Sequence, residues 1–139
     1  MKGTYILAIN IPEKRNINIG ALGTIPFKKG FYFYIGSAMG ATGSSTLLNR
    51  VKRHLKPPIN KKIHWHIDYL LNDKYSRIIR IFLIPSMLKL ECIIAEELSD
   101  LSEGIIKDFG CSDCKCLSHL LYFKNFSSLK EIYKKGLTL

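Results

Sequence analysis

The chain has 139 residues, of which 47% are hydrophobic and 23% are charged. This length and mixture predict a single folded domain over residues 1–139 and exclude a disordered or fibrous chain. No apolar run reaches the roughly 18 residues that span a bilayer. Lysine and arginine number 21 against 11 acidic residues, which leaves a net charge of +10. Such an excess favours a polyanionic partner.

The first ten residues are apolar, but they lack a small-residue cleavage site and run directly into Pro12. We interpret them as a strand and not as a targeting segment. We therefore expect a cytoplasmic protein that binds no membrane, with its four cysteines in a reducing compartment.

The first third of the chain is typical of β-structure. Alternating apolar and β-branched residues predict strands, and glycines and a polar turn over residues 12–16 predict where the strands end. The predicted strands are Thr4–Ile11, Ile17–Ile25 and Phe31–Ile35. Because short turns connect them, we expect an opening antiparallel β-meander.

Helices and two further strands are predicted along the rest of the chain. The first helix has apolar residues at helical spacing (Leu47, Leu48, Val51 and Leu55), and a Pro-Pro pair ends it. The predicted elements are helices at Thr46–Leu55 and Met87–Leu101 (the longest), a short helix or a turn into one at His64–Leu71, a last helix from Ser128 to Gly136, a buried strand at Arg77–Ile84 and an edge strand at His119–Phe123. The fold class is therefore α+β, with a small mixed or antiparallel sheet flanked by helices.

Short motifs occur in order along these elements. They are Gly3-Thr4-Tyr5 on the first strand, Tyr34-Ile35-Gly36 at the end of the third, and Arg50 four residues before His54 on the first helix. This series resembles the GIY-YIG nuclease superfamily, and the Uri branch is the closer match through the stretches 64–71, 90–92 and 112–119. The resemblance covers residues 3 to 123. Two departures are Thr4, where the family has isoleucine, and the long interval of 29 positions from Tyr5 to Tyr34.

The resemblance implies a catalytic set of Tyr5, Tyr34, Arg50 and His54, with Glu91 as the ligand of Mg²⁺ or Mn²⁺. In such a site the cation and Arg50 shield an anionic phosphodiester. Beside them the phenolate of Tyr5 becomes accessible as the general base. Tyr34 orients water or phosphate, and His54 assists as a hydrogen-bond donor or proton shuttle. The alternative for both tyrosines is ordinary core packing.

Helical spacing tests two of these assignments. At about 100° per residue, Arg50 lies just beside the apolar sector of its helix and can lean toward the sheet. Glu91 falls at about 40° from Met87, inside the apolar face, whereas Glu96 falls near 180°. We therefore expect Glu91 to be partly buried and to need a cation, an arginine or a metal. A purely structural pair with Arg50 or Arg77 is the alternative.

Basic residues near these elements predict contacts with a nucleic-acid backbone. They are Lys28, Lys29, Lys52, Arg53 and Lys56. Solvated surface charge is the alternative interpretation, and for Arg53 the two interpretations are evenly balanced.

A cysteine-rich stretch suggests zinc, because thiolates and imidazoles are zinc ligands. The residues are Cys111, Cys114, Cys116 and His119. The spacing is irregular and no second distant pair exists, so reduced cysteines in a tight loop are favoured and zinc is the alternative. Likewise His64 and His66 face different ways and are interpreted as a packed helix start.

The sequence thus predicts a metal-dependent endonuclease that hydrolyses phosphodiester bonds in DNA, with branched or damaged duplexes as candidate substrates that the sequence does not distinguish from other DNA. The alternative is a nucleic-acid-binding module on the same scaffold that cleaves slowly or not at all. No pattern indicates base readout or an oligomeric state, and none distinguishes DNA from RNA.

Overall fold

The strands form one antiparallel sheet of five, in the order β5-β1-β4-β7-β6, and a separate two-stranded hairpin, β2-β3. The computed structural model describes residues 1–110 and 116–125. Within these residues the strands are β1 (Gly3–Ile11), β2 (Arg15–Asn18), β3 (Thr24–Phe27), β4 (Gly30–Ala38), β5 (Arg77–Pro85), β6 (Gly104–Ile105) and β7 (Leu120–Phe123). The predicted α+β class is confirmed.

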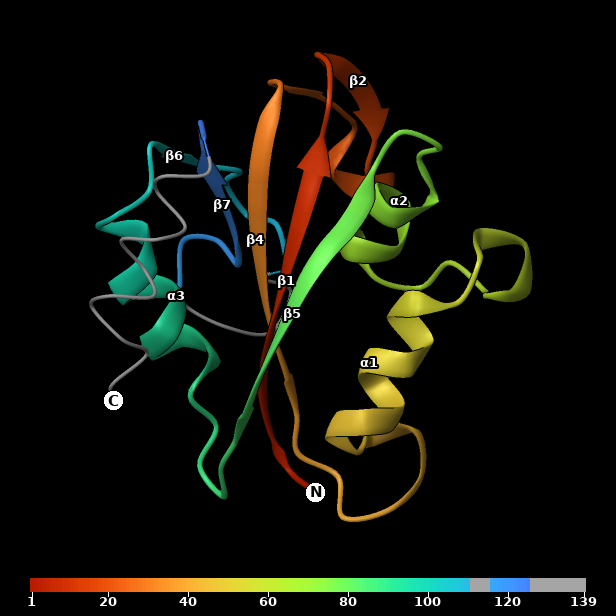
Figure 1. Ribbon diagram of the computed structural model, residues 1–139, viewed down its shortest axis with the longest axis vertical. Helices are drawn as coiled ribbons and strands as arrows, with labels where there is room; N and C mark the ends of the chain where they lie inside the picture. Colours follow the sequence, from red (N-terminus) through yellow and green to blue (C-terminus); the bar gives the residue numbers. More distant parts are fainter. Residues whose placement is uncertain (111–115, 126–139) are drawn as a thin grey trace.

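Helices cover both faces of the sheet. They are α1 (Leu47–Leu55), α2 (His66–Asn72) and α3 (Glu91–Ser99), with 3-10 turns at Gly20–Leu22, Gly43–Ser45 and Pro58–Asn60. Figure 1 shows α1 and α2 on one side of the sheet and α3 on the other. The buried residues form two clusters accordingly, one shared with α1 and α2 and one shared with α3.

β1 lies inside the sheet and is buried on both faces. Leu7 and Ile9 pack toward α1 and α2, whereas Ile6 and Ala8 pack toward α3. Because successive strand residues point to opposite faces, a strand covered on both sides needs apolar residues at almost every position. β1 pairs with β4 and β5, so the predicted meander with Ile17–Ile25 as its second strand is wrong.

The predicted strand Ile17–Ile25 is divided into two short strands. Gly20 and Gly23 both have positive φ, of 52° and 77°, and they turn the chain so that β2 pairs with β3. Left-handed backbone of this kind is accessible to glycine and interrupts a strand. The alternation was therefore real, but it belongs to a hairpin outside the main sheet.

Two predictions about strand position are also wrong. β5 is an edge strand that pairs only with β1 within the described sheet, and several of its residues are exposed. The strand predicted at His119–Phe123 is not an edge strand, because the short β6 pairs with β7 on its outer side. A two-residue strand has no periodicity to detect, which is why β6 was not predicted.

The helices are shorter than predicted. α3 begins at Glu91 and ends at Ser99, so it is no longer than α1, and Met87 and Leu88 before it are exposed. The Ser86 hydroxyl accepts a hydrogen bond from Leu88 N at 2.9 Å and holds a turn there. On α1, Leu48 and Leu55 are exposed, contrary to the predicted apolar face. The helix predicted from Ser128 to Gly136 lies outside the described residues.

Candidate active site

The ladder between β1 and β4 brings Tyr5 and Tyr34 to the same face of the sheet. Tyr5 pairs with Gly36, Leu7 pairs with Tyr34, and the two tyrosine rings lie 6.3 Å apart between centroids. A Cβ at position 36 would collide with the Tyr5 ring. The glycine of the Tyr34-Ile35-Gly36 motif therefore makes room for the tyrosine of the first motif.

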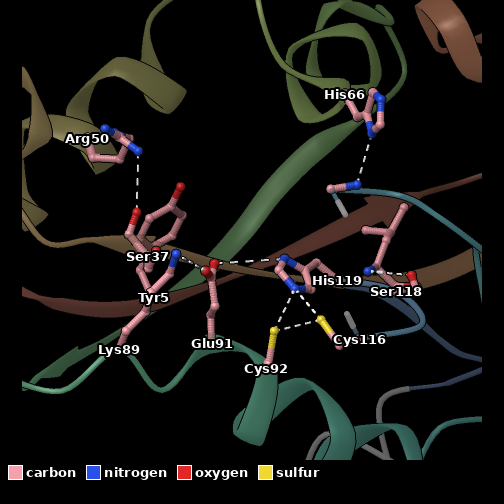
Figure 2. Close-up of polar contacts among 12 residues, drawn as sticks. Tyr5, Ser37, Arg50, His66, Lys89, Glu91, Cys92, Cys116, Ser118 and His119 are labelled. Carbon is pink, nitrogen blue, oxygen red and sulfur yellow. Dashed lines mark hydrogen bonds and ion pairs between the residues drawn. The ribbon is translucent and has the colours of Figure 1, made fainter. Parts of the chain in front are cut away.

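These tyrosines line a pocket of about 280 Å³ together with residues from several other elements. Among the predicted site residues, Tyr5, Tyr34, Arg50 and Glu91 all line it. The other lining residues are Ser37, His64, Trp65, His66, Lys89, Gly110 and His119. Figure 2 shows Arg50 from α1 and Glu91 from the start of α3 on opposite sides of Tyr5. The structure thus gathers in one pocket four residues that lie far apart in the sequence.

Arg50 is held at the pocket by backbone and aromatic contacts. Its Nη1 donates to Ser37 O at 3.3 Å, and its guanidinium carbon lies 4.7 Å from the centroid of the Trp65 ring. Its Nε is buried and has no hydrogen-bond partner among the described residues. The predicted lean of Arg50 toward the sheet is confirmed, and its guanidinium brings a positive charge to the pocket.

Arg53 has a structural partner that the sequence did not reveal. Its guanidinium donates to both oxygens of Asp68, at 2.8 and 2.9 Å, and its guanidinium carbon lies 4.4 Å from the centroid of the Trp65 ring. The Asp68 carboxylate also accepts hydrogen bonds from the backbone N–H groups of His64 and Trp65. Burial acts to raise the pKa of Asp68, but these donors outweigh it and lower that pKa. Arg53 is therefore tied into an ion pair and is not the freely solvated charge that both sequence interpretations assumed, and its contact with phosphate stays a prediction.

Glu91 is buried, with 9% of its surface exposed, as its helical position predicted, and Glu96 on the same helix is exposed. One oxygen, Oε1, lies 3.2 Å from the Lys89 ammonium, and the other, Oε2, lies 3.8 Å from Nδ1 of His119. The predicted alternative partners, Arg50 and Arg77, are not its ion-pair partners among the described residues. Glu91 is the carboxylate that lines the pocket.

The tyrosines and His54 form a buried, uncharged group. The Tyr5 hydroxyl and Nε2 of His54 lie 2.7 Å apart in a hydrogen bond. Burial raises the pKa of Tyr5 more than Arg50 lowers it, and burial also raises the pKa of Tyr34 well above its usual value. Burial lowers the pKa of His54 to about 3, so His54 is neutral. The protein groups alone, Arg50 included, therefore do not make the Tyr5 phenolate accessible.

His64 and His66, which we interpreted from the sequence as a packed helix start, both line the pocket. His66 is the first residue of α2, and its Nδ1 accepts a hydrogen bond from Gly110 N at 2.9 Å. Burial lowers the pKa of His66, so the ring is neutral and carries its proton on Nε2. His66 is therefore a hydrogen-bond donor at the pocket, and only its alternation with Trp65 and His64 in the sequence could have suggested it.

The predicted basic rim is not gathered at the pocket. Lys28 and Lys29 precede Gly30, which pairs with Ile11, six positions along β1 from Tyr5. At about 3.3 Å per strand residue this is about 20 Å. Lys52 and Lys56 are exposed on and after α1 and do not line the pocket. The lysine that does line it is Lys89.

Two thiols lie close to the imidazole of His119, which itself lines the pocket. Cys92, Cys116 and His119 have ligand atoms that all lie within 4.8 Å of one another. Cys92 was not predicted to belong to such a group, and Cys111 and Cys114 lie outside the described residues. Only Cys116 and His119 of the predicted zinc motif can therefore be placed.

The chain belongs to the DUF123 family, whose model is described as a domain of unknown function and matches residues 4–138. No curated protein and no solved structure matches the chain. Within the described residues, no helix is long and apolar enough to cross a bilayer.

Proposed function

We propose that this DUF123 chain is a metal-dependent endonuclease of the GIY-YIG type that hydrolyses phosphodiester bonds in DNA in the cytoplasm. The observation that carries the proposal is the shared pocket of Tyr5, Tyr34, Arg50 and Glu91. These are the residues to which the Uri-like motifs assign the chemistry. The net charge of +10 favours a polyanionic substrate.

The residues of the pocket fit a divalent cation and a phosphate together. Glu91 offers hard carboxylate oxygens, and Mg²⁺ in proteins is commonly held by one or two carboxylates plus water and substrate phosphate. When bound, Mg²⁺ or Mn²⁺ neutralises phosphate charge and stabilises the departing alkoxide. Lys89 contacts Glu91 at 3.2 Å, but its side chain is 55% exposed and is able to move toward the phosphate.

The other pocket residues have distinct tasks in hydrolysis. Arg50 binds the phosphoryl oxygens through its guanidinium, since the residue lines the pocket. Attack by water forms one bond to phosphorus and breaks the bond to the leaving oxygen, which takes up a proton. The Tyr5 oxygen takes the water proton while the Tyr5 proton passes on to the leaving oxygen, and neutral His54, whose Nε2 lies 2.7 Å away, holds the Tyr5 hydroxyl in place. Tyr34 orients the water or the phosphate.

A non-cleaving DNA-binding module is the second candidate, and two observations favour it. The same ion pair between Lys89 and Glu91 places an ammonium group against the proposed metal ligand, and burial keeps both phenols protonated. In this alternative the pocket binds a phosphate and holds no catalytic cation.

Cleavage of plasmid and branched DNA with Mg²⁺, and with a chelator in its place, tests the proposal. We expect Mg²⁺-dependent cleavage that Glu91→Gln abolishes while DNA binding is retained. The matched control is Glu96→Gln on the exposed face of the same helix, which should cleave like the wild type. If the wild type binds DNA and leaves every substrate intact, the endonuclease proposal fails and the binding module stands.

A further inference from the structure

The group of Cys92, Cys116 and His119 joins two segments that are far apart in the sequence. Cys92 is the second residue of α3, whereas Cys116 and His119 lie in the segment that leads into β7. Sγ of Cys92 lies 2.8 Å from Sγ of Cys116, and Nε2 of His119 lies 2.6 Å from Sγ of Cys116 and 3.6 Å from Sγ of Cys92. Figure 2 shows the two sulfur atoms converging on one edge of the His119 ring.

The backbone around His119 holds this group in place. His119 N donates to Phe109 O at 2.9 Å, and its carbonyl accepts from Ile35 N at 3.0 Å, so the residue is tied to β4. The Ser118 hydroxyl accepts a hydrogen bond from Leu120 N at 2.9 Å. Cys116 and His119 are buried, with 8% and 2% of their surface exposed. The fold therefore positions the side chains of Cys116 and His119 before any ion binds.

The other nitrogen of His119 supplies a second, independent observation. Nδ1 lies 3.8 Å from the Glu91 carboxylate, on the ring edge away from the sulfur atoms, as Figure 2 shows. Histidines that ligate zinc commonly direct their second nitrogen toward a carboxylate, which sets the tautomer and leaves the first nitrogen for the ion. The Glu91 carboxylate faces Nδ1 of His119 at a distance longer than a hydrogen bond, while the two thiols lie against Nε2, which leaves Nε2 and the sulfur atoms as the groups that can hold one ion.

We propose that Cys92, Cys116 and Nε2 of His119 bind a soft divalent transition-metal ion, of which Zn²⁺ is the expected one. Thiolate and imidazole select Zn²⁺ over the hard cation proposed for Glu91. Two thiolates about 2.3 Å from one tetrahedral ion lie about 3.8 Å apart, so binding separates the sulfur atoms by about 1 Å. The ion links the start of α3 to the segment before β7 and thereby fixes the position of Glu91.

Metal analysis of the full chain tests this site without any DNA. Protein purified without a polyhistidine tag or chelator is expected to retain about one Zn²⁺ per chain after dialysis. Replacement by Co²⁺ should produce the intense thiolate-to-metal charge-transfer absorption of sulfur ligation. Cys92→Ser, which preserves size at a partly exposed position, should lose most of both signals. His64→Gln, a histidine at the pocket but outside the group, is the matched control and should keep them.

Three results would overturn the site. They are a wild-type chain that retains no Zn²⁺ after incubation and dialysis, a Co²⁺ spectrum without thiolate absorption, and a disulfide between Cys92 and Cys116 in freshly purified protein. The wild-type Co²⁺ spectrum decides the question even if the Cys92→Ser variant misfolds. This inference does not rest on the proposed function, because a zinc-loaded chain that cuts no DNA refutes the endonuclease alone.

Discussion

Replacing Asp68 with asparagine tests how the pocket is supported. Asp68 is 1% exposed, and its carboxylate accepts two hydrogen bonds from Arg53 and two from backbone N–H groups. The asparagine side chain has nearly the same size but no charge, and its amide group would face the guanidinium donors. Removing one partner of a buried ion pair costs about 3–5 kcal/mol. Because the Arg53 side chain is 22% exposed and water can solvate it, we expect a loss near the lower end, about 3 kcal/mol.

Urea denaturation and thermal melting measure this loss. For a chain of this size about 3 kcal/mol corresponds to a fall in Tm of about 10 °C. Glu96→Gln, at an exposed carboxylate, should change the free energy of unfolding by less than about 0.5 kcal/mol. A double-mutant cycle with Arg53→Met isolates the pair, and the two losses should not add. Additive losses, or a loss below about 1 kcal/mol for Asp68→Asn, would refute the reasoning.

The same variant has a spectroscopic readout at the pocket. Trp65 is the single tryptophan of the chain, and its ring lies against the guanidinium groups of both Arg50 and Arg53. Loss of the Asp68 contacts to Trp65 N and to Arg53 should let water reach the indole. We expect native-state fluorescence of Asp68→Asn to shift to longer wavelength, with weaker cleavage because Arg50 loses its stacking partner.

Three further outcomes are expected. Gly36→Ala places a methyl group in the Tyr5 ring and should lower the free energy of unfolding by about 1–3 kcal/mol in denaturant titrations, whereas Gly104→Ala, where the nearest atom is 3.9 Å away, should have little effect. Burial lowers the pKa of His54 from 6.5 to about 3, so between these pH values the unfolded chain binds a proton that the native chain lacks. The free energy of unfolding should therefore fall by up to about 1.4 kcal/mol per pH unit as the pH drops from 6.5 toward 3. His54→Gln should flatten this pH dependence in thermal melts, and an unchanged slope would contradict the reasoning. Tyr5→Phe should slow DNA cleavage by about 10²- to 10⁴-fold. The control is Tyr32→Phe, at a buried tyrosine that does not line the pocket and whose hydroxyl donates a hydrogen bond to Lys28 O. An equal loss in this control would assign the effect to packing.

The position of Glu91 shows why one part of the site was predictable. The sequence placed Glu91 on a buried helix face and Glu96 on an exposed one, and both predictions are confirmed although α3 begins four residues later than expected. The spacing of Glu91, Ile94 and Leu98 on one face depends only on helical periodicity, and not on where the helix begins. Glu91 is therefore buried together with Ile94 and Leu98, although Met87, which lies before the helix, is exposed.

The sequence by itself determined the elements whose pattern is local. Alternation in Thr4–Ile11 and Phe31–Ile35 and the helical spacing of Leu47 and Val51 predicted β1, β4 and α1, because each pattern depends on neighbours a few residues away. The ordered motifs on these elements pointed to Tyr5, Tyr34 and Arg50, which line the pocket, and to His54, which does not line it but contacts the Tyr5 hydroxyl.

Only the tertiary structure decided which distant residues meet. Asp68 reaches Arg53 from 15 positions away, and Cys92 meets Cys116 and His119 from 24 and 27 positions away. These contacts depend on the strand order β5-β1-β4-β7-β6 and on α3 crossing to the second face of the sheet. Local periodicity carries no information about strand order, since the same alternation suits an edge strand, a central strand or a separate hairpin.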